Sequence, residues 1–197
     1  MAGKDGYHHG DLRAELLRQG HALLVERGTD AFSLNELARR AGVSTAAPYR
    51  HFPDRDHLID AVADEGYVIF GAALARAVER ADDAGDAVRR VLLAYLDFAD
   101  EHRAYFSVMF RDRGERPNVV GPPTFATFAD AIVAAQASGH LDGSVDPRAL
   151  GRALWAGVHG AATLEATGGF AKLGLDVLRG QLVDEILGPH LRVSAAS

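Results

Sequence analysis

The stretch from Ser33 to Phe52 constrains the fold more than any other, because it has the pattern of two short helices joined by a tight corner. Ser33 and Glu36 have the spacing of a capping box, which predicts the start of the first helix. Gly42 follows where a left-handed residue ends a helix, and Ser44 offers an N-cap for the second helix. The sequence therefore predicts a helix-turn-helix.

Almost every other segment has the apolar spacing and end signals of a helix. Asp11, Asp54 and Asp86 are expected near helix starts, and Asp146-Pro147 is a strong start with proline in the first turn. We predict an all-α protein of about nine helices, with a three-helix head over residues 9–69 and a helical body over residues 70–197. The further helices are expected over about 11–28, 54–80, 86–102, 105–110, 124–137, 146–167 and 175–187.

Composition excludes several classes of protein. The 197 residues contain no cysteine, which rules out a disulfide scaffold and a thiol nucleophile, and suits the cytoplasm. No apolar run approaches a membrane span. The formal net charge is -6, so a surface for nucleic acid would have to be a local patch. No catalytic constellation, phosphate loop or metal spacing stands out, so we expect no enzyme, no cofactor and no metal ion.

Residues 10–69 resemble the N-terminal domain of the tetracycline-repressor (TetR) family. The resemblance is carried by Gly28, Phe32-Ser33-Leu34, Leu37-Ala38, Ala41-Gly42-Val43-Ser44, Tyr49, His51-Phe52 and Leu58. It implies a DNA-binding head, a ligand-binding body and a homodimer on a double-stranded, pseudo-palindromic operator. It also implies a transcriptional regulator, in most cases a repressor, that a small molecule releases from DNA. A helical enzyme or ligand carrier and a protein-interaction module are the alternative interpretations.

The resemblance also implies which residues meet DNA. Thr45, Ala46 and Arg50 stand where the recognition helix reaches base edges, and the remaining residues cap helices or contact phosphates. Pro48 departs from the leucine more often found there, so the recognition helix is expected to start late or to be partly 3₁₀. The predicted DNA-binding set is Ser33, Ser44, Thr45, Ala46, Tyr49, Arg50, His51 and Arg55.

In the second half, Trp155 and His159 are one turn apart on a predicted helix. With Gly160 they resemble a Trp-His-Gly motif of one TetR subgroup, which also often has a Tyr-His-His-Gly-like N-terminus, here at residues 7–10. Two interpretations remain open: a pocket wall for a small apolar or amphipathic effector, or a packed core with a satisfied histidine. The candidate pocket residues are Tyr95, Phe98, Phe106, Phe125, Phe128, Trp155 and His159.

A leucine-rich stripe from Leu175 to Leu187 is wide enough to dock a partner helix. Together with the small residues around Gly157, it suits a four-helix dimer interface. Packing within one chain is the alternative. The candidate interface residues are Gly157, Leu175, Leu178, Leu182 and Ile186.

Overall fold

The computed structural model describes residues 9–29 and 32–192. In this part of the chain there are ten α-helices, two 3₁₀-helices and no strand beyond an isolated bridge between Leu141 and Leu191. The predicted all-α class is confirmed. The chain forms two compact units: the first holds residues up to Gly66 together with Ala104–Asn118, and the second holds Tyr67–Arg103 and the residues from Val119 onward.

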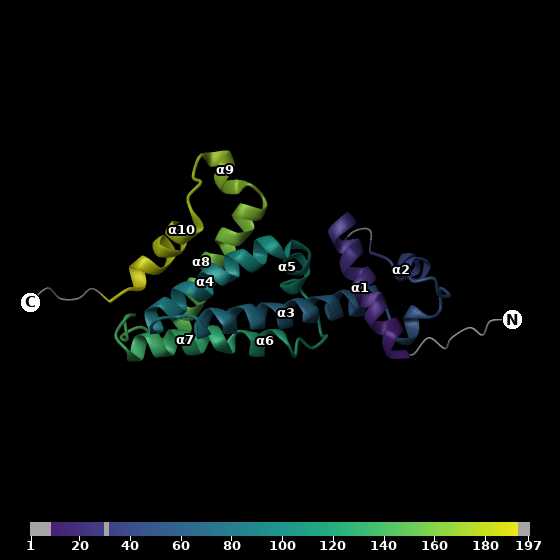
Figure 1. The fold of residues 1–197 in the computed structure, drawn as a ribbon, viewed down its shortest axis with the longest axis horizontal. Coiled ribbons are helices and arrows are strands. Elements are labelled where there is room, and N and C mark those ends of the chain that lie inside the picture. Colours follow the sequence, from purple (N-terminus) through teal and green to yellow (C-terminus); the bar gives the residue numbers. More distant parts are fainter. Residues whose placement is uncertain (1–8, 30–31, 193–197) are drawn as a thin grey trace, which may run out of the picture. The chain divides into compact units, whose positions relative to one another are not determined.

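The first unit is built on short helices around a small apolar core. Its elements are α1 (His9–Arg27), α2 (Leu34–Arg40), η1 (Pro48–Arg50), the first half of α3 (Arg55–Glu79) and nearly all of α5 (Arg103–Met109). Figure 1 shows α2 beside α1. The core side chains include Leu16, Leu23, Phe32, Leu37, Phe52, Leu58 and Val62.

Two of the predicted helix starts in this unit can be compared with the structure. Asp54 caps α3 as predicted, because its Oδ1 accepts a hydrogen bond from the backbone N–H of His57 at 2.9 Å. Asp11 is not the N-cap of the first helix, since α1 already begins at His9. Tyr7 and His8 of the N-terminal motif lie outside the described residues.

The second unit is a helical body in which α4, α7 and α8 pack against one another and α10 packs on α4 and α8. Asp83, rather than Asp86, caps α4, and Asp146 caps α8 with Pro147 in the first turn. Phe70, Leu92, Leu96, Ile132, Leu154 and Val183 lie in its core. Its elements after α3 are α4 (Ala84–Glu101), α6 (Gly121–Thr124), α7 (Ala126–Ala137), α8 (Pro147–Ala166), α9 (Gly169–Leu173), α10 (Arg179–Leu187) and η2 (Gly188–His190).

Residues 104–118 belong by their contacts to the first unit, together with the residues up to Gly66. Helix α5 approaches α3 closely at Gly66, where a Cβ atom would lie 2.9 Å from the Tyr105 Cβ. The loop after α5 is held by ion pairs, because Arg111, Arg113 and Arg116 face the carboxylates of α3. Those carboxylates are Asp56, Asp60 and Asp64, which recur every four residues and so share one face of α3.

Candidate nucleic-acid face and body groove

The corner after α2 is closed by backbone hydrogen bonds. Gly42 has φ +67°, the left-handed conformation that glycine adopts without a Cβ penalty. The Val43 N–H donates to the Ala38 carbonyl at 3.0 Å, and the Gly42 N–H donates to the Arg39 carbonyl at 3.3 Å. These two bonds form a Schellman motif, which confirms the predicted stop at Gly42. The turn fixes the direction in which the chain leaves α2.

The recognition segment is shorter than a regular helix. Residues 45–47 form turns and only Pro48–Arg50 is helical, as a 3₁₀-helix. The expected 3₁₀ character is therefore confirmed, but one expected cause is wrong: Ala47 keeps helical dihedrals (φ −65°, ψ −43°) although proline follows it. Pro48 has no N–H to donate, and instead its carbonyl accepts from the N–H groups of His51 and Phe52, both at 2.9 Å.

Burial divides this segment into an inner and an outer face. Pro48 and Phe52 are buried, and Phe52 also lies beneath the Arg13 guanidinium at 5.3 Å. The outer face carries exposed side chains that include a hydroxyl, a methyl group, a phenol (Tyr49, 49% exposed) and a guanidinium. Its members are Ser44, Thr45, Ala46, Tyr49 and Arg50, all from the predicted DNA-binding set, and His51 is half-buried beside them.

Most of the positive charge on α2 is already paired. Hydrogen bonds from Arg39, and then from Arg40, lower the pKa of Glu36 to about 2. Arg40 also donates to Glu26 at 2.6 Å. Arg50 forms no hydrogen bond or ion pair with the residues that the structure describes. It is therefore the arginine of residues 33–52 whose guanidinium is available to an external acceptor.

Two other residues of the predicted DNA-binding set, Arg55 and Ser33, lie next to the loop before α2. The Arg55 guanidinium donates to the carbonyls of Phe32 at 3.0 Å and of Thr29 at 2.5 Å, and so ties the start of α3 to the loop before α2. Ser33 is the N-cap residue of α2, but its side chain makes no capping hydrogen bond. The predicted capping box does not form, because Glu36 turns to Arg39 and Arg40 instead.

The Trp-His pair of the body forms a hydrogen-bonded cluster with Tyr95. The Trp155 Nε1–H donates to the Tyr95 hydroxyl at 3.3 Å, and that hydroxyl lies 2.7 Å from His159 Nδ1. In the tautomer of His159 with its proton on Nε2, Nδ1 accepts the hydroxyl proton of Tyr95, and this hydroxyl can accept from tryptophan at the same time. Burial raises the pKa of Tyr95 and lowers that of His159. This supports the interpretation of a satisfied histidine.

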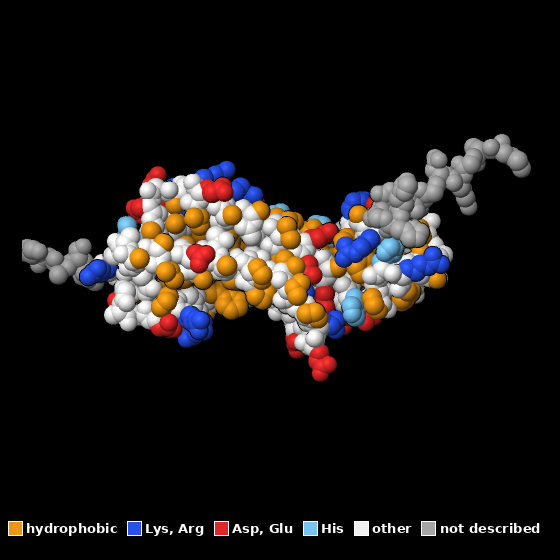
Figure 2. All heavy atoms as spheres, turned by 90° about the horizontal axis from the view of Figure 1, so that it is seen from below, with side chains coloured by type: hydrophobic (Ala, Val, Ile, Leu, Met, Phe, Trp, Pro, Cys, Tyr) orange, Lys and Arg blue, Asp and Glu red, His pale blue; other side chains and the backbone are white. Residues whose placement is uncertain are grey.

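The interior beside this cluster is filled. Phe70 packs against Tyr95 at 5.1 Å and Phe98 at 4.9 Å between ring centroids, and the remaining cavity is only about 10 Å³. A groove of about 490 Å³ lies instead between α7 and α8. Figure 2 views the α7 side of the body, where hydrophobic side chains are numerous. The groove is lined by Phe125, Phe128, Ala129, Val133, Pro147, Arg148, Gly151, Arg152 and Trp155.

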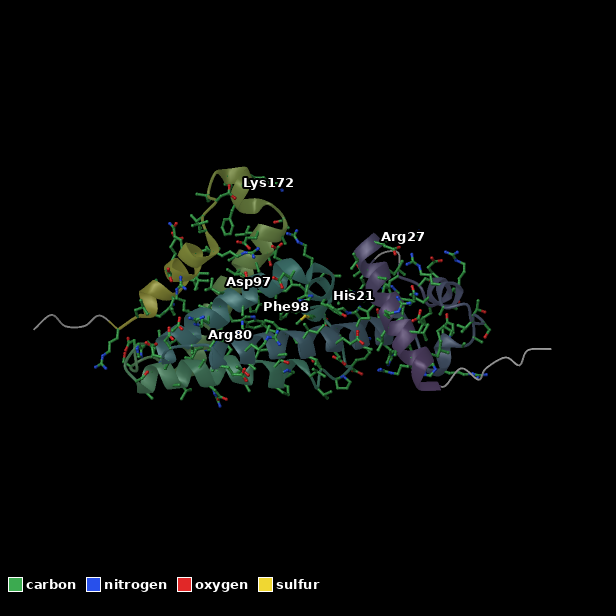
Figure 3. The ribbon with its side chains drawn as sticks, viewed as in Figure 1. His21, Arg27, Arg80, Asp97, Phe98 and Lys172 are labelled. Atoms are coloured by element: carbon green, nitrogen blue, oxygen red, sulfur yellow. The ribbon has the colours of Figure 1, made fainter. Side chains whose placement is uncertain are left out.

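The structure brings together only some of the candidate pocket residues. Phe125, Phe128 and Trp155 line the groove, and Tyr95 and His159 lie behind Trp155. Phe98, labelled in Figure 3, is buried against Phe70 and His102. Phe106 belongs to the first unit, where its ring packs on Phe110 at 5.3 Å.

The candidate dimer residues also divide. Gly157 is covered within the chain, because a Cβ there would lie 3.1 Å from the Ile186 Cγ2, and Leu182 is buried. Leu175 and Leu178 precede α10, which begins only at Arg179, and both are exposed. The continuous helical stripe predicted from Leu175 is therefore wrong, because residues 175–178 lie outside any helix.

Arg148 and Arg152 of the groove were not identified from the sequence. A signal was present, because these two arginines are one helical turn apart and Trp155 follows three residues after Arg152. The ion cluster between α3 and residues 111–116 was also not identified from the sequence. No described helix combines the length and apolarity that crossing a bilayer requires.

Comparisons with known proteins assign the chain to a family. The family model for tetracyclin repressor-like C-terminal domains matches residues 88–187, and the model for bacterial regulatory proteins of the tetR family matches residues 16–62. A solved protein of unknown function from Rhodococcus sp. RHA1 is 33% identical, over 96% of this chain and 100% of that chain, with a TM-score of 0.81.

Two more distant structures share the fold. They are a TetR family transcription regulator from Marinobacter aquaeolei VT8 (16% identity, 92% and 96% of the two chains, TM-score 0.68) and the ketosteroid transcriptional regulator KstR2 of Mycobacterium tuberculosis (17% identity, 92% and 95%, TM-score 0.63). The chain therefore belongs to the tetR family of bacterial regulatory proteins and is a transcription regulator with an N-terminal DNA-binding domain.

Proposed function

We propose that this regulator is a cytoplasmic repressor that binds a pseudo-palindromic operator as a homodimer and leaves it when a small apolar or amphipathic effector binds the body. The head would comprise residues 9–69 and the effector-binding and dimerisation region residues 70–197, in the subgroup with the Trp-His-Gly motif. The observation that carries the proposal is the outer face of residues 44–50, set by the turn at Gly42.

On that face, Arg50 is the long donor suited to a guanine edge, because a guanidinium can donate to O6 and N7 together. Thr45 and Ala46 present methyl groups that fit a thymine methyl. Tyr49 and His51 suit phosphate oxygens, which set register without specifying sequence. A dimer doubles this short reading surface over two half-sites.

The first test is duplex binding by the full chain, followed by fluorescence anisotropy at several salt concentrations. We expect Arg50→Ala to weaken binding to a selected operator by about 1–3 kcal/mol and to relax the preference at one base pair. Arg80→Ala is the matched control, because Arg80 (labelled in Figure 3) is an exposed arginine of the second unit. If Arg50→Ala weakens every duplex equally, Arg50 contacts phosphate and does not read bases.

A further inference from the structure

The groove between α7 and α8 has aromatic walls and a cationic rim. Phe125 and Phe128 of the α7 side and Trp155 of α8 supply the apolar surface, and Arg148 and Arg152 stand one turn apart on α8. Its lining contains no carboxylate. The volume of about 490 Å³ lies within the range of small-molecule sites.

Unlike Arg89 and Arg179 of the body, the two groove arginines have no acidic partner among the described residues. Arg89 is 2.6 Å from Asp184, and Arg179 is 2.8 Å from Asp100. Arg148 and Arg152 form no hydrogen bond or ion pair with any residue that the structure describes. Like charges at this spacing repel on a helix. An anion between them would remove that repulsion and accept charge-assisted hydrogen bonds.

The Trp155 ring is a fixed wall of this groove. Its Nε1–H is held by the buried Tyr95 hydroxyl, while 38% of the residue remains exposed. The indole therefore offers a flat apolar surface without the entropy cost of being ordered by a ligand. Through Tyr95 and His159, the wall is hydrogen-bonded to both α4 and α8.

We propose that the groove binds a small amphipathic carboxylate, with the carboxylate between Arg148 and Arg152 and the apolar part against Trp155 and Phe125. The assignment of this ligand as the effector rests on the proposed function. Binding itself does not, because it depends only on the groove.

The test uses the single tryptophan of the sequence as the reporter. The full chain is titrated with decanoate, decan-1-ol and decyltrimethylammonium, which share an apolar chain and differ in charge. We expect decanoate to shift the Trp155 emission to shorter wavelength and to bind at least about tenfold more tightly than the alcohol. Arg148→Gln/Arg152→Gln should reduce decanoate affinity to that of the alcohol and leave the alcohol unchanged. Arg80→Gln is the charge-matched control and should change none of the three.

Each single variant, Arg148→Gln or Arg152→Gln, should weaken decanoate binding by about threefold, which is half of a tenfold preference in free energy. The single variants replace the double variant in the test if the double variant has a lowered Tm. Equal affinities for the three probes, or wild-type decanoate affinity in the arginine variants, would overturn the proposal. A third result would also overturn the proposal: wild type shows no preference for the carboxylate, and the double variant no longer self-associates in light scattering. The groove would then be a contact between two copies of the chain.

Duplex binding is measured on the same preparations without a ligand, so that the two proposals fail separately. Salt-dependent duplex binding without carboxylate preference rejects the groove site alone. Arginine-dependent decanoate binding without duplex binding supports the groove site and rejects the proposed function.

Discussion

Asp60→Asn removes the charge at the centre of the ion cluster that holds residues 111–116 to α3. Asp60 is only 7% exposed. Its carboxylate lies 2.5 Å from Arg116 Nε, 3.5 Å from Arg111 Nη2 and 3.8 Å from Arg113 Nε. Asparagine has nearly the same shape, so the substitution changes charge while it leaves packing in place.

The size of the effect follows from burial. Removing one partner of a buried ion pair costs about 3–5 kcal/mol. The Arg111 and Arg116 side chains are 21% and 29% exposed, and Asp64 stays 2.8 Å from Arg113, so part of the interaction is retained or screened by water. We therefore expect a loss of about 2–3 kcal/mol in the free energy of unfolding, or a fall in Tm of about 5–10 °C for a chain of this size.

Thermal melts followed by circular dichroism measure this loss, and hydrogen exchange locates it. Amides of residues 104–118 should exchange faster in Asp60→Asn, since the loop after α5 loses its attachment to α3. Asp130→Asn is the control, because Asp130 is an exposed carboxylate of α7 without an ion pair among the described residues. If both variants melt at the same temperature, the cluster does not hold the segment and the reasoning is refuted.

Two further predictions concern the body. Burial lowers the pKa of His159, so the folded protein binds fewer protons at this residue than the unfolded chain does. The contribution of the neutral histidine to the free energy of unfolding is therefore fully present above its unfolded pKa near 6.5, and it is lost as the pH drops below that value. Between about pH 7.5 and about pH 5.5, Tm should therefore fall more for wild type than for His159→Gln, and equal falls would contradict a buried neutral histidine. Leu178 is 81% exposed beside α10, so Leu178→Glu should give folded monomers in light scattering, whereas Val119→Glu, at an exposed site before α6, should not. A dimeric Leu178→Glu would place the interface elsewhere.

Helix ends could be predicted from the sequence wherever the signal is local. The left-handed stop at Gly42, the cap at Asp54 and the Asp146-Pro147 start of α8 each depend on a few neighbouring residues and the dihedral angles they allow. The shift of the α4 start from Asp86 to Asp83 shows the limit, since both residues are aspartates and only the observed backbone shows which one caps.

Unit membership could not be predicted in the same way. Residues 104–118 follow a body helix in sequence, and their apolar spacing is equally suited to either unit. Two contacts with residues distant in the sequence decide the matter: the close approach of α5 to Gly66 and the ion pairs of Arg111–Arg116 with α3. Periodicity reports which face of a helix is buried, but not what buries it.

Side-chain partners show the same limit at the candidate sites. Arg50 and Arg55 are five residues apart in the sequence, and both were expected to meet DNA. In the structure, Arg55 faces two backbone carbonyls of the loop before α2, whereas Arg50 faces no acceptor among the described residues. An arginine satisfied within its own chain gains less from a new acceptor than one that is unpaired, because the existing hydrogen bonds must first be lost. The same argument separates Arg179, held by three carboxylates, from Arg148 and Arg152 of the groove. Arg50 on the outer face of residues 44–50 and Arg148 and Arg152 beside the groove therefore keep donors for DNA and for a ligand, each next to exposed side chains that suit that partner.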